Sequence, residues 1–432
     1  MTHGMVEVSL NSQPTSQVKS DRVVYLEETL HLRHDPFSYP VAEVEIQVNP
    51  YDPPFFRYYV DPPYESADEA NSPLLDNLEQ SGAAIIYGAA GSGKTTLCYR
   101  LEAACRETAV PTLTLNHVLG KDPDLTDPEG FWQTLNEGLA TDLFIQVLER
   151  FDSFSPTLLT ELTPSLAHYW TGHIPQFSRN IQRHLAQRQP TAATGMSAQW
   201  WPIWQRAAVR YTPFTPARAQ FLSRLLETSP PWSNGQLIDK NSFQKGIALA
   251  QRLGFAQVFF LVDIVEAEKR AQKKLDSHIQ RLWRDLLPLP MPIPFYPKFF
   301  LPIRLKPLLD SLIGQIPLIS PIFSAIMNWN RSQALTELIE NRFRSAGGWI
   351  RGFDVLASEE IVSELSEAIL RVANHSPRRL LQVHSLLIEA HVSRDPKDPQ
   401  ITTADWQRLC DLWSYDPPSP IPLMGSATIV RS

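Results

Sequence analysis

The sequence predicts an α/β fold: a five-stranded parallel sheet with a large helical insertion and a C-terminal helical lid. Apolar runs of strand length lie around residues 83–87, 112–115, 257–262, 297–301 and 322–328. Segments with helical periodicity separate these runs, which favours parallel strands. The gap between the second and third runs is far longer than one βα unit needs, so it predicts inserted helices. The expected domains are an extension at 1–48, a core at 49–345 with the insertion at about 120–254, a lid at 346–415 and a flexible tail at 416–432.

The composition is that of a globular protein. Of the 432 residues, 43% are hydrophobic and 20% are charged, and at ~150 residues per domain the length suits two or three domains. The net charge of −7 provides no strong global attraction for nucleic acid. Three cysteines without C-x-x-C spacing exclude a disulfide framework or a zinc ribbon and suit a reducing cytosol. The start of the chain holds no apolar run, so we expect no secretory signal and a cytoplasmic protein.

An uncharged segment at 311–330 has the length of a membrane-spanning helix. It contains Pro317 and Pro321, which break a helix interior. The β-rich residues 322–327 look instead like a buried strand after a loop. We therefore do not expect the chain to enter a membrane.

One stretch organises the chain: the complete G-x-x-x-x-G-K-[ST] pattern of residues 88–95, here named the glycine loop. A strand-length apolar run precedes it and a helical pattern follows, which is the context that a phosphate-binding loop requires. Glycines let successive N–H groups face a phosphate, and the helix N-terminus adds positive potential. Lys94 would reach the β- and γ-phosphates, and Thr95 would hold Mg²⁺. The expected nucleotide-binding residues are Gly88, Ala89, Ala90, Gly91, Ser92, Gly93, Lys94, Thr95 and Thr96.

The second landmark is the apolar run 256–262, which ends in Asp263. A continuous apolar run predicts a strand buried on both faces. Ligands gather at the carboxyl ends of parallel strands, so Asp263 is the expected second Mg²⁺ ligand. Glu266 follows within one helical turn and is the candidate to orient an attacking water. Together the two landmarks predict the core of a P-loop NTPase.

Residues 49–64 form a segment, here named the aromatic loop, with six aromatic residues and five prolines just before the first core strand. One interpretation is a wall for a nucleobase, because flat bases stack well on aromatic faces. The alternative is a hydrophobic strap that closes the domain. Further elements expected around it are a half-buried strand at 44–48 and a helix at 65–80.

Two groups of cations have open roles. Arg270, Lys273 and Lys274 share a helix face that could meet nucleic acid or a partner, although a solvated face fits the negative net charge better. Arg378 and Arg379 fall in the first turn of a helix that starts at Pro377. Cations there oppose the helix dipole, which indicates a nearby anion.

The chain resembles the bacterial AAA+/STAND-like P-loop ATPases, in an uncharacterised branch. The resemblance rests on the glycine loop, Asn49-Pro50-Tyr51, Tyr58-Tyr59-Val60-Asp61-Pro62-Pro63-Tyr64, Lys298-Phe299-Phe300-Leu301-Pro302 and Ser376-Pro377-Arg378-Arg379-Leu380-Leu381, and covers roughly residues 49–410. It implies that Arg378 contacts the γ-phosphate and couples it to lid closure. It also implies that Arg342 or Arg344 could reach across a subunit interface. The family's water-activating glutamate is replaced by Ala267, so Glu266 is the candidate substitute.

These observations predict an ATP- and Mg²⁺-dependent switch with Lys94, Glu266 and Arg378 as catalytic residues. Its expected partner is a protein or a second copy, nucleic acid is not favoured, and hydrolysis would reset the switch. One alternative is a nucleotide-binding scaffold with little or no hydrolysis. Others are a nucleic-acid-associated ATPase and a small-molecule kinase. Guanine specificity is not expected because the chain lacks N-K-x-D, and an ABC transporter subunit is not expected because it lacks L-S-G-G-Q.

Overall fold

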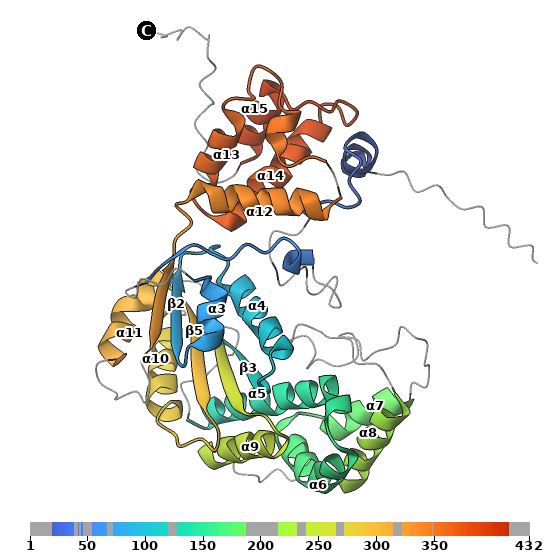
Figure 1. Ribbon diagram of the computed structural model, residues 1–432, viewed down its shortest axis with the longest axis vertical. Helices are drawn as coiled ribbons and strands as arrows, with labels where there is room; N and C mark the ends of the chain where they lie inside the picture. Colours follow the sequence, from blue (N-terminus) through green and yellow to red (C-terminus); the bar gives the residue numbers. More distant parts are fainter. Residues whose placement is uncertain are drawn as a thin grey trace, which may run out of the picture.

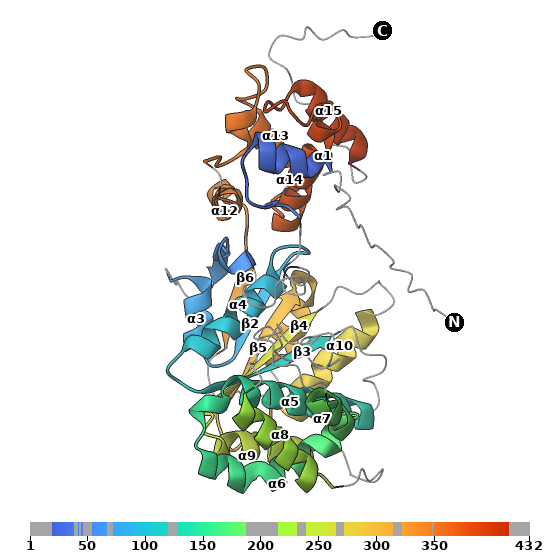
Figure 2. The ribbon, with the colours of Figure 1, turned by 90° about the vertical axis from the view of Figure 1, so that its right-hand side faces the viewer.

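The computed structural model is an α/β protein whose sheet lies between a body of inserted helices and a helical lid (Figure 1). The structure describes residues 20–38, 42, 45, 54–66, 72–119, 128–186, 215–230, 239–264, 272–313, 322–347 and 349–413. The lid runs from α12 (Ser332–Ser345) to α15 (Thr403–Leu412) and stands over one end of the sheet, and the inserted helices gather at the opposite end (Figures 1 and 2). The sheet therefore joins two helical bodies.

The sheet has six strands in the order β1-β6-β2-β5-β4-β3. Its strands are β1 (Tyr64–Ser66), β2 (Ala84–Gly88), β3 (Thr112–Leu119), β4 (Gln257–Ile264), β5 (Phe295–Pro302) and β6 (Phe323–Met327). The five predicted strands, β2 to β6, are present and mutually parallel. Strand β5 lies between β2 and β4, so one strand separates the glycine loop's strand from the strand that ends near Asp263.

Strand β1 corrects the predicted helix at 65–80. Glu65 pairs with Ile326 in an antiparallel register that adds a sixth, edge strand. The helix α3 spans only Leu74–Gln80, with Pro73 as its N-cap. Proline disfavours the helical conformation for the residue before it, so a helix through this position is not stable.

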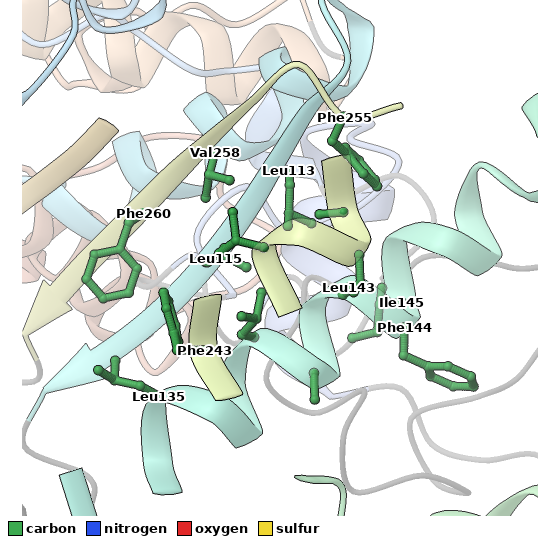
Figure 3. Close-up of a cluster of buried hydrophobic side chains, with 14 of the residues drawn as sticks. Leu113, Leu115, Leu135, Leu143, Phe144, Ile145, Phe243, Phe255, Val258 and Phe260 are labelled. Atoms are coloured by element: carbon green, nitrogen blue, oxygen red, sulfur yellow. The ribbon is translucent and has the colours of Figure 1, made fainter. Parts of the chain in front are cut away.

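Each face of the sheet has its own hydrophobic core, because successive strand side chains point to opposite sides. Ala84 and Ile86 of β2 face α3 and α4 (Lys94–Glu107). Ile85 and Tyr87 belong to the opposite core, with the inserted helices. Figure 3 shows part of this second core, where Leu113 and Phe260 of the sheet meet side chains of the inserted helices.

The described residues of the insertion are helical, as the sequence predicts. The helices between β3 and β4 are α5 (Pro128–Glu149), α6 (Pro156–His173), α7 (Phe177–Ala186), α8 (Pro216–Thr228) and α9 (Lys240–Arg252). Helix α5 also closes the edge of β3: Gln146 bonds both the N–H and the C=O of Thr114, at 3.1 and 2.6 Å. Such side-chain pairing protects an edge strand from joining another chain. The tryptophan-rich stretch at 199–204 of the insertion lies outside the described residues.

After β4 the chain forms α10 (Gln272–Arg281), the π-helix η6 (Leu282–Leu286) and α11 (Lys306–Ile313). Among the described residues, no helix combines the length and the apolar character needed to cross a membrane. Phe323–Met327 forms strand β6, as predicted for that part of the uncharged segment. Residues 314–321 lie outside the described part.

The lid consists of α12 (Ser332–Ser345), α13 (Leu365–Ala373), α14 (Pro377–Val392) and α15 (Thr403–Leu412). Its hydrophobic core includes Leu335 and Phe343 of α12, so the packing boundary falls near residue 331 and not at 346.

The N-terminal extension packs on the lid. It forms α1 (Asp21–Val23) and the π-helix η1 (Val24–Thr29), which lie beside α14 (Figure 2). Arg22 donates to the Ser385 carbonyl at 3.1 Å, and the Tyr25 ring lies 4.4 Å from that of His391. Of the predicted strand at 44–48, only Glu45 is described, and its backbone is helical. The described part of the chain therefore runs from the lid to the sheet and returns to the lid after β6.

A buried lysine joins the sheet to α3. Lys298 of β5 is 0% exposed, and its ammonium donates to the Leu78 carbonyl at 2.7 Å and to the carbonyl and hydroxyl of Ser81, both at 2.8 Å. These carbonyls end α3, so the lysine satisfies groups that a helix C-terminus leaves without partners. Burial lowers the pKa of the ammonium to about 7.

Candidate functional site

The glycine loop has a conformation that requires two of its glycines. Gly91 and Gly93 have φ of +73° and +91°, in the left-handed region that side chains disfavour. A side chain from the residues that follow β6 also holds the loop, because Trp329 Nε1 donates to the Ser92 carbonyl at 2.8 Å. Helix α4 begins within the last two residues of the glycine loop, at Lys94. The first N–H groups of α4 and its positive end therefore adjoin the loop.

Lys94 lies over the loop. Its ammonium donates to the Gly88 carbonyl at 3.1 Å and to the Ala89 carbonyl at 2.8 Å. The side chain lines a cavity and is 7% exposed. A phosphate in that cavity could compete for the ammonium, because a charged acceptor forms a stronger hydrogen bond than a carbonyl.

Thr95 and Asp263 meet at the start of α4. Asp263 lies on the same face of β4 as Phe259 and Leu261, because every second residue of a strand points to the same side. Those two side chains pack on the face that carries α4. The strand therefore directs the carboxylate toward that helix. Thr95 Oγ1 donates to Asp263 Oδ2 at 2.6 Å, while Asp263 Oδ1 accepts from the Ile264 N–H at 2.8 Å. Two residues that the sequence assigns to one metal are thus in direct contact.

The lid touches the glycine loop. Helix α14 starts at Pro377, with Ser376 as its N-cap, and the Arg378 N–H donates to the Gly91 carbonyl at 3.3 Å. A Cβ at Gly91 would lie 2.9 Å from both Arg378 Cβ and Ser376 Oγ. Gly91 therefore allows both the turn of the loop and the close approach of the lid. The Arg378 side chain is exposed and lines the cavity.

The cavity has a volume of about 260 Å³ and lies where loop, lid and aromatic loop meet. Helix α4 and the glycine loop contribute Ala90, Gly91, Gly93, Lys94, Thr95 and Thr96; the aromatic loop contributes Phe55, Tyr58, Tyr59, Val60 and Pro62; the lid contributes Leu338, Arg342, Pro377, Arg378 and Leu381. Ala42, Glu45, Ile264 and Trp329 complete the wall. The size approaches the lower end of the range for small-molecule pockets, ~300–1,000 Å³.

The aromatic loop lines the cavity and packs against α4, and its role as a nucleobase wall stays a prediction. Phe55 and Tyr58 form a small buried cluster with Ala42, and Tyr99 of α4 packs against it. The Arg100 guanidinium lies 5.1 Å from the Phe56 ring centroid and 5.5 Å from that of Tyr59. The aromatic rings are thereby fixed to α4, one to two turns beyond Thr95.

Arg342 is directed into its own chain. It is 5% exposed, and it donates to the Pro36 carbonyl at 2.6 Å and to Glu45 Oε1 at 3.0 Å. Its guanidinium stacks on Tyr58, 4.1 Å from the ring centroid. The structure thus contradicts a reach of Arg342 across a subunit interface. Arg344 is exposed and bonds Asn341 at 2.9 Å.

Glu45 is a cavity residue that sequence reasoning missed. It accepts hydrogen bonds from Arg342 and from the Tyr58 hydroxyl. Burial raises the pKa of Glu45, and the Arg342 charge acts against that shift. No motif marks this glutamate or Trp329, because their partners lie hundreds of residues away in the sequence.

The Thr95–Asp263 pair suits a magnesium ion. Mg²⁺ prefers oxygen ligands and usually binds through one or two carboxylates together with substrate phosphates. A hydroxyl and a carboxylate already adjoin here, next to a loop of backbone N–H groups. Among the described residues, no group of three or more His, Cys, Asp and Glu side chains gathers as a metal cage. A metal at Thr95 and Asp263 would therefore complete its shell with phosphate oxygens and water.

Two predicted features lie outside the described residues: Glu266, and the side chains of the basic face at 270–274. Of the predicted site residues that it describes, the structure brings together the glycine loop, Asp263 and Arg378.

No protein-family model matches the chain, and no curated protein matches it. The inference of function consequently rests on the geometry of this site.

Proposed function

We propose that the chain is an ATP- and Mg²⁺-binding P-loop protein of AAA+/STAND type that works as a conformational switch. The observation that carries the proposal is the 2.6 Å contact between Thr95 and Asp263, which are 168 positions apart in the sequence. In a phosphate-binding loop, the hydroxyl after the lysine and the aspartate of a neighbouring strand hold the same metal ion. A chance glycine-rich turn gives no reason for that pairing.

In this proposal the residues have separate tasks. The loop N–H groups and Lys94 bind the phosphates, and Mg²⁺ supplied with the nucleotide neutralises their charge. Thr95 and Asp263 hold the ion in place. The aromatic loop covers the nucleoside part, where its apolar rings exclude water.

The lid supplies the switch. It contacts the glycine loop directly, since the Arg378 N–H donates to the Gly91 carbonyl at 3.3 Å. The exposed Arg378 guanidinium lines the same cavity, where a γ-phosphate would attract it. A nucleotide with three phosphates therefore favours the closed lid more than one with two. A partner that binds one lid position would read this difference.

A second candidate is a nucleotide-binding scaffold without appreciable turnover. Among the described residues that line the cavity, Glu45 is the one carboxylate, and Arg342 and Tyr58 already bond it. Water activation would then depend on Glu266. Phosphate release from ATP separates the two candidates: the switch predicts release that Glu266→Gln reduces, whereas the scaffold predicts ATP binding without release.

Titration calorimetry with ATP and Mg²⁺ tests the proposal as a whole. We expect saturable binding at one site per chain, and weaker binding of ADP than of ATP because Arg378 has no γ-phosphate to meet. Absence of ATP binding in the presence of Mg²⁺ would refute the proposed function. Native mass measurement in the same buffers would show whether ATP also drives self-association.

A further inference from the structure

The cavity has a charged end that the phosphate-binding residues do not explain. Glu45 and Arg342 are 2% and 5% exposed, and their side chains are 3.0 Å apart. Tyr58 donates to the second oxygen of Glu45. Replacing a buried ion pair by apolar residues is often neutral or stabilising, so stability alone does not account for the pair.

One nitrogen of the Arg342 guanidinium has no hydrogen-bond partner in the part of the chain that the structure describes. A guanidinium has five N–H donors in a rigid fork. In Arg342, Nη1 donates to the Pro36 carbonyl and Nη2 to Glu45, but the buried Nε–H has no partner among the described residues. A buried donor without an acceptor is costly. A small rotation of the side chain toward the cavity that it lines would bring this N–H to a ligand acceptor.

The charged pair adjoins the aromatic loop, because the Arg342 guanidinium stacks on Tyr58. Tyr58 belongs to the cluster that packs against Tyr99, one turn after Thr95 in α4. A triphosphate held by the glycine loop would therefore extend its nucleoside part toward Tyr58 and Arg342. Apolar side chains of the aromatic loop and the lid, Val60, Leu338 and Leu381, flank the path. An apolar slot with a few fixed polar groups is the usual composition of a ligand pocket.

We propose that Arg342 determines specificity by donating a hydrogen bond to an acceptor on the nucleoside part of the bound nucleotide. Glu45 holds the guanidinium in position and leaves its Nε–H available to a ligand. The inference rests on the proposed function, and it assigns the part of the cavity around Tyr58 and Arg342 to the nucleoside. It also gives the lid a second contact with the ligand, because Arg342 belongs to α12, whereas Arg378 belongs to α14.

The test compares ATP with inorganic tripolyphosphate, each with Mg²⁺, because only ATP has a nucleoside part. Arg342→Lys keeps the charge beside Glu45 but removes the planar fork. We expect it to weaken ATP about tenfold and to leave tripolyphosphate unchanged, as loss of one hydrogen bond predicts. Arg344→Lys is the matched control, since Arg344 lies on the same helix at the surface, and it should change neither affinity.

The outcomes separate this inference from the proposed function. An equal loss for both ligands, or no loss for ATP, would overturn the role of Arg342 and leave the phosphate site intact. If neither ligand bound the unmodified protein, the proposed function itself would fail. If Arg342→Lys did not fold, Glu45→Gln would replace it: the guanidinium stays but loses its charged partner, and ATP should weaken severalfold while tripolyphosphate does not. Equal effects on both ligands would again overturn the inference.

Discussion

Two buried lysines, Lys94 and Lys298, have similar partners and different surroundings. Both donate to backbone carbonyls: Lys94 to Gly88 and Ala89, Lys298 to Leu78 and Ser81. Lys298 is sealed between β5 and α3 at 0% exposure, whereas Lys94 lines the cavity. A carbonyl is a weaker acceptor than a phosphate, so only the lysine beside a cavity can exchange its partner. The comparison shows that access, and not the hydrogen bonds alone, distinguishes a binding lysine from a structural one.

The largest effect is expected for Lys94→Ala. It removes the ammonium from the proposed phosphate site, and loss of a charge-assisted hydrogen bond in a cavity should weaken ATP about 100-fold, or about 2.7 kcal/mol. Its free energy of unfolding should change much less than that of a Lys298 variant. Calorimetry and urea denaturation measure the two quantities. Unchanged ATP affinity would show that Lys94, like Lys298, is structural.

Lys298→Met should have the opposite profile. The variant keeps an unbranched side chain but leaves the Leu78 and Ser81 carbonyls without their donor, so we expect a loss of about 1–3 kcal/mol in the free energy of unfolding. The ATP affinity of the folded variant should not change, because the lysine lies outside the cavity. A stability equal to that of the unmodified protein would contradict the role of Lys298 in ending α3.

Gly91→Ala tests the contact between lid and loop. Alanine is strained at φ +73° and its Cβ would also meet Arg378 and Ser376 at 2.9 Å, so we expect ATP binding to weaken and stability to fall by about 1–3 kcal/mol. Gly254→Ala is the matched control. It has the same kind of strain, with φ of +94°, but no atom within 4 Å of the new Cβ. If both variants bound ATP equally well, the lid contact would have no role in binding.

We also expect a pH dependence of the stability from Lys298. Its pKa is lowered to about 7 in the folded protein by burial, while the unfolded chain titrates near the ordinary value of ~10.4. Between these values the unfolded state binds more protons, so this lysine makes stability rise with pH. The cost of burying the charge is fully present below pH ~7 and declines as the pH approaches ~10. The stability difference between the unmodified protein and Lys298→Met should grow over this window. A constant difference in urea denaturation would contradict the shift.

The sequence predicted the features that are encoded locally. The glycine loop is contiguous, so its pattern and flanks were sufficient to predict a strand, a turn and a helix there. A continuous apolar run that ends in a charged residue indicated β4 and Asp263. The five parallel strands and the inserted helices followed from periodicity. The resemblance implied that Arg378 contacts a γ-phosphate, which stays a prediction; what the structure shows is that its backbone N–H bonds the Gly91 carbonyl.

Features that depend on distant residues were not predictable in this way. The Glu45–Arg342 pair joins positions 297 apart, and the alternating pattern at 44–48 places Glu45 on the polar side of the expected strand and not in a buried ion pair. Strand β1 is only three residues long and needs β6 to form, so its sequence was mistaken for the start of a helix. The sequence did not indicate that the extension packs on the lid, where Tyr25 and Leu26 belong to the lid core. Tertiary packing decided each of these cases.

The most direct test of the central claim is the Mg²⁺ dependence of ATP binding in the unmodified protein and in Asp263→Asn, measured by titration calorimetry. The account predicts that Mg²⁺ strengthens ATP binding strongly in the unmodified protein and little in the variant, because Asp263 and Thr95 then no longer hold the ion together. An equal Mg²⁺ effect in both proteins would contradict it, and so would an unmodified protein that does not bind ATP with Mg²⁺.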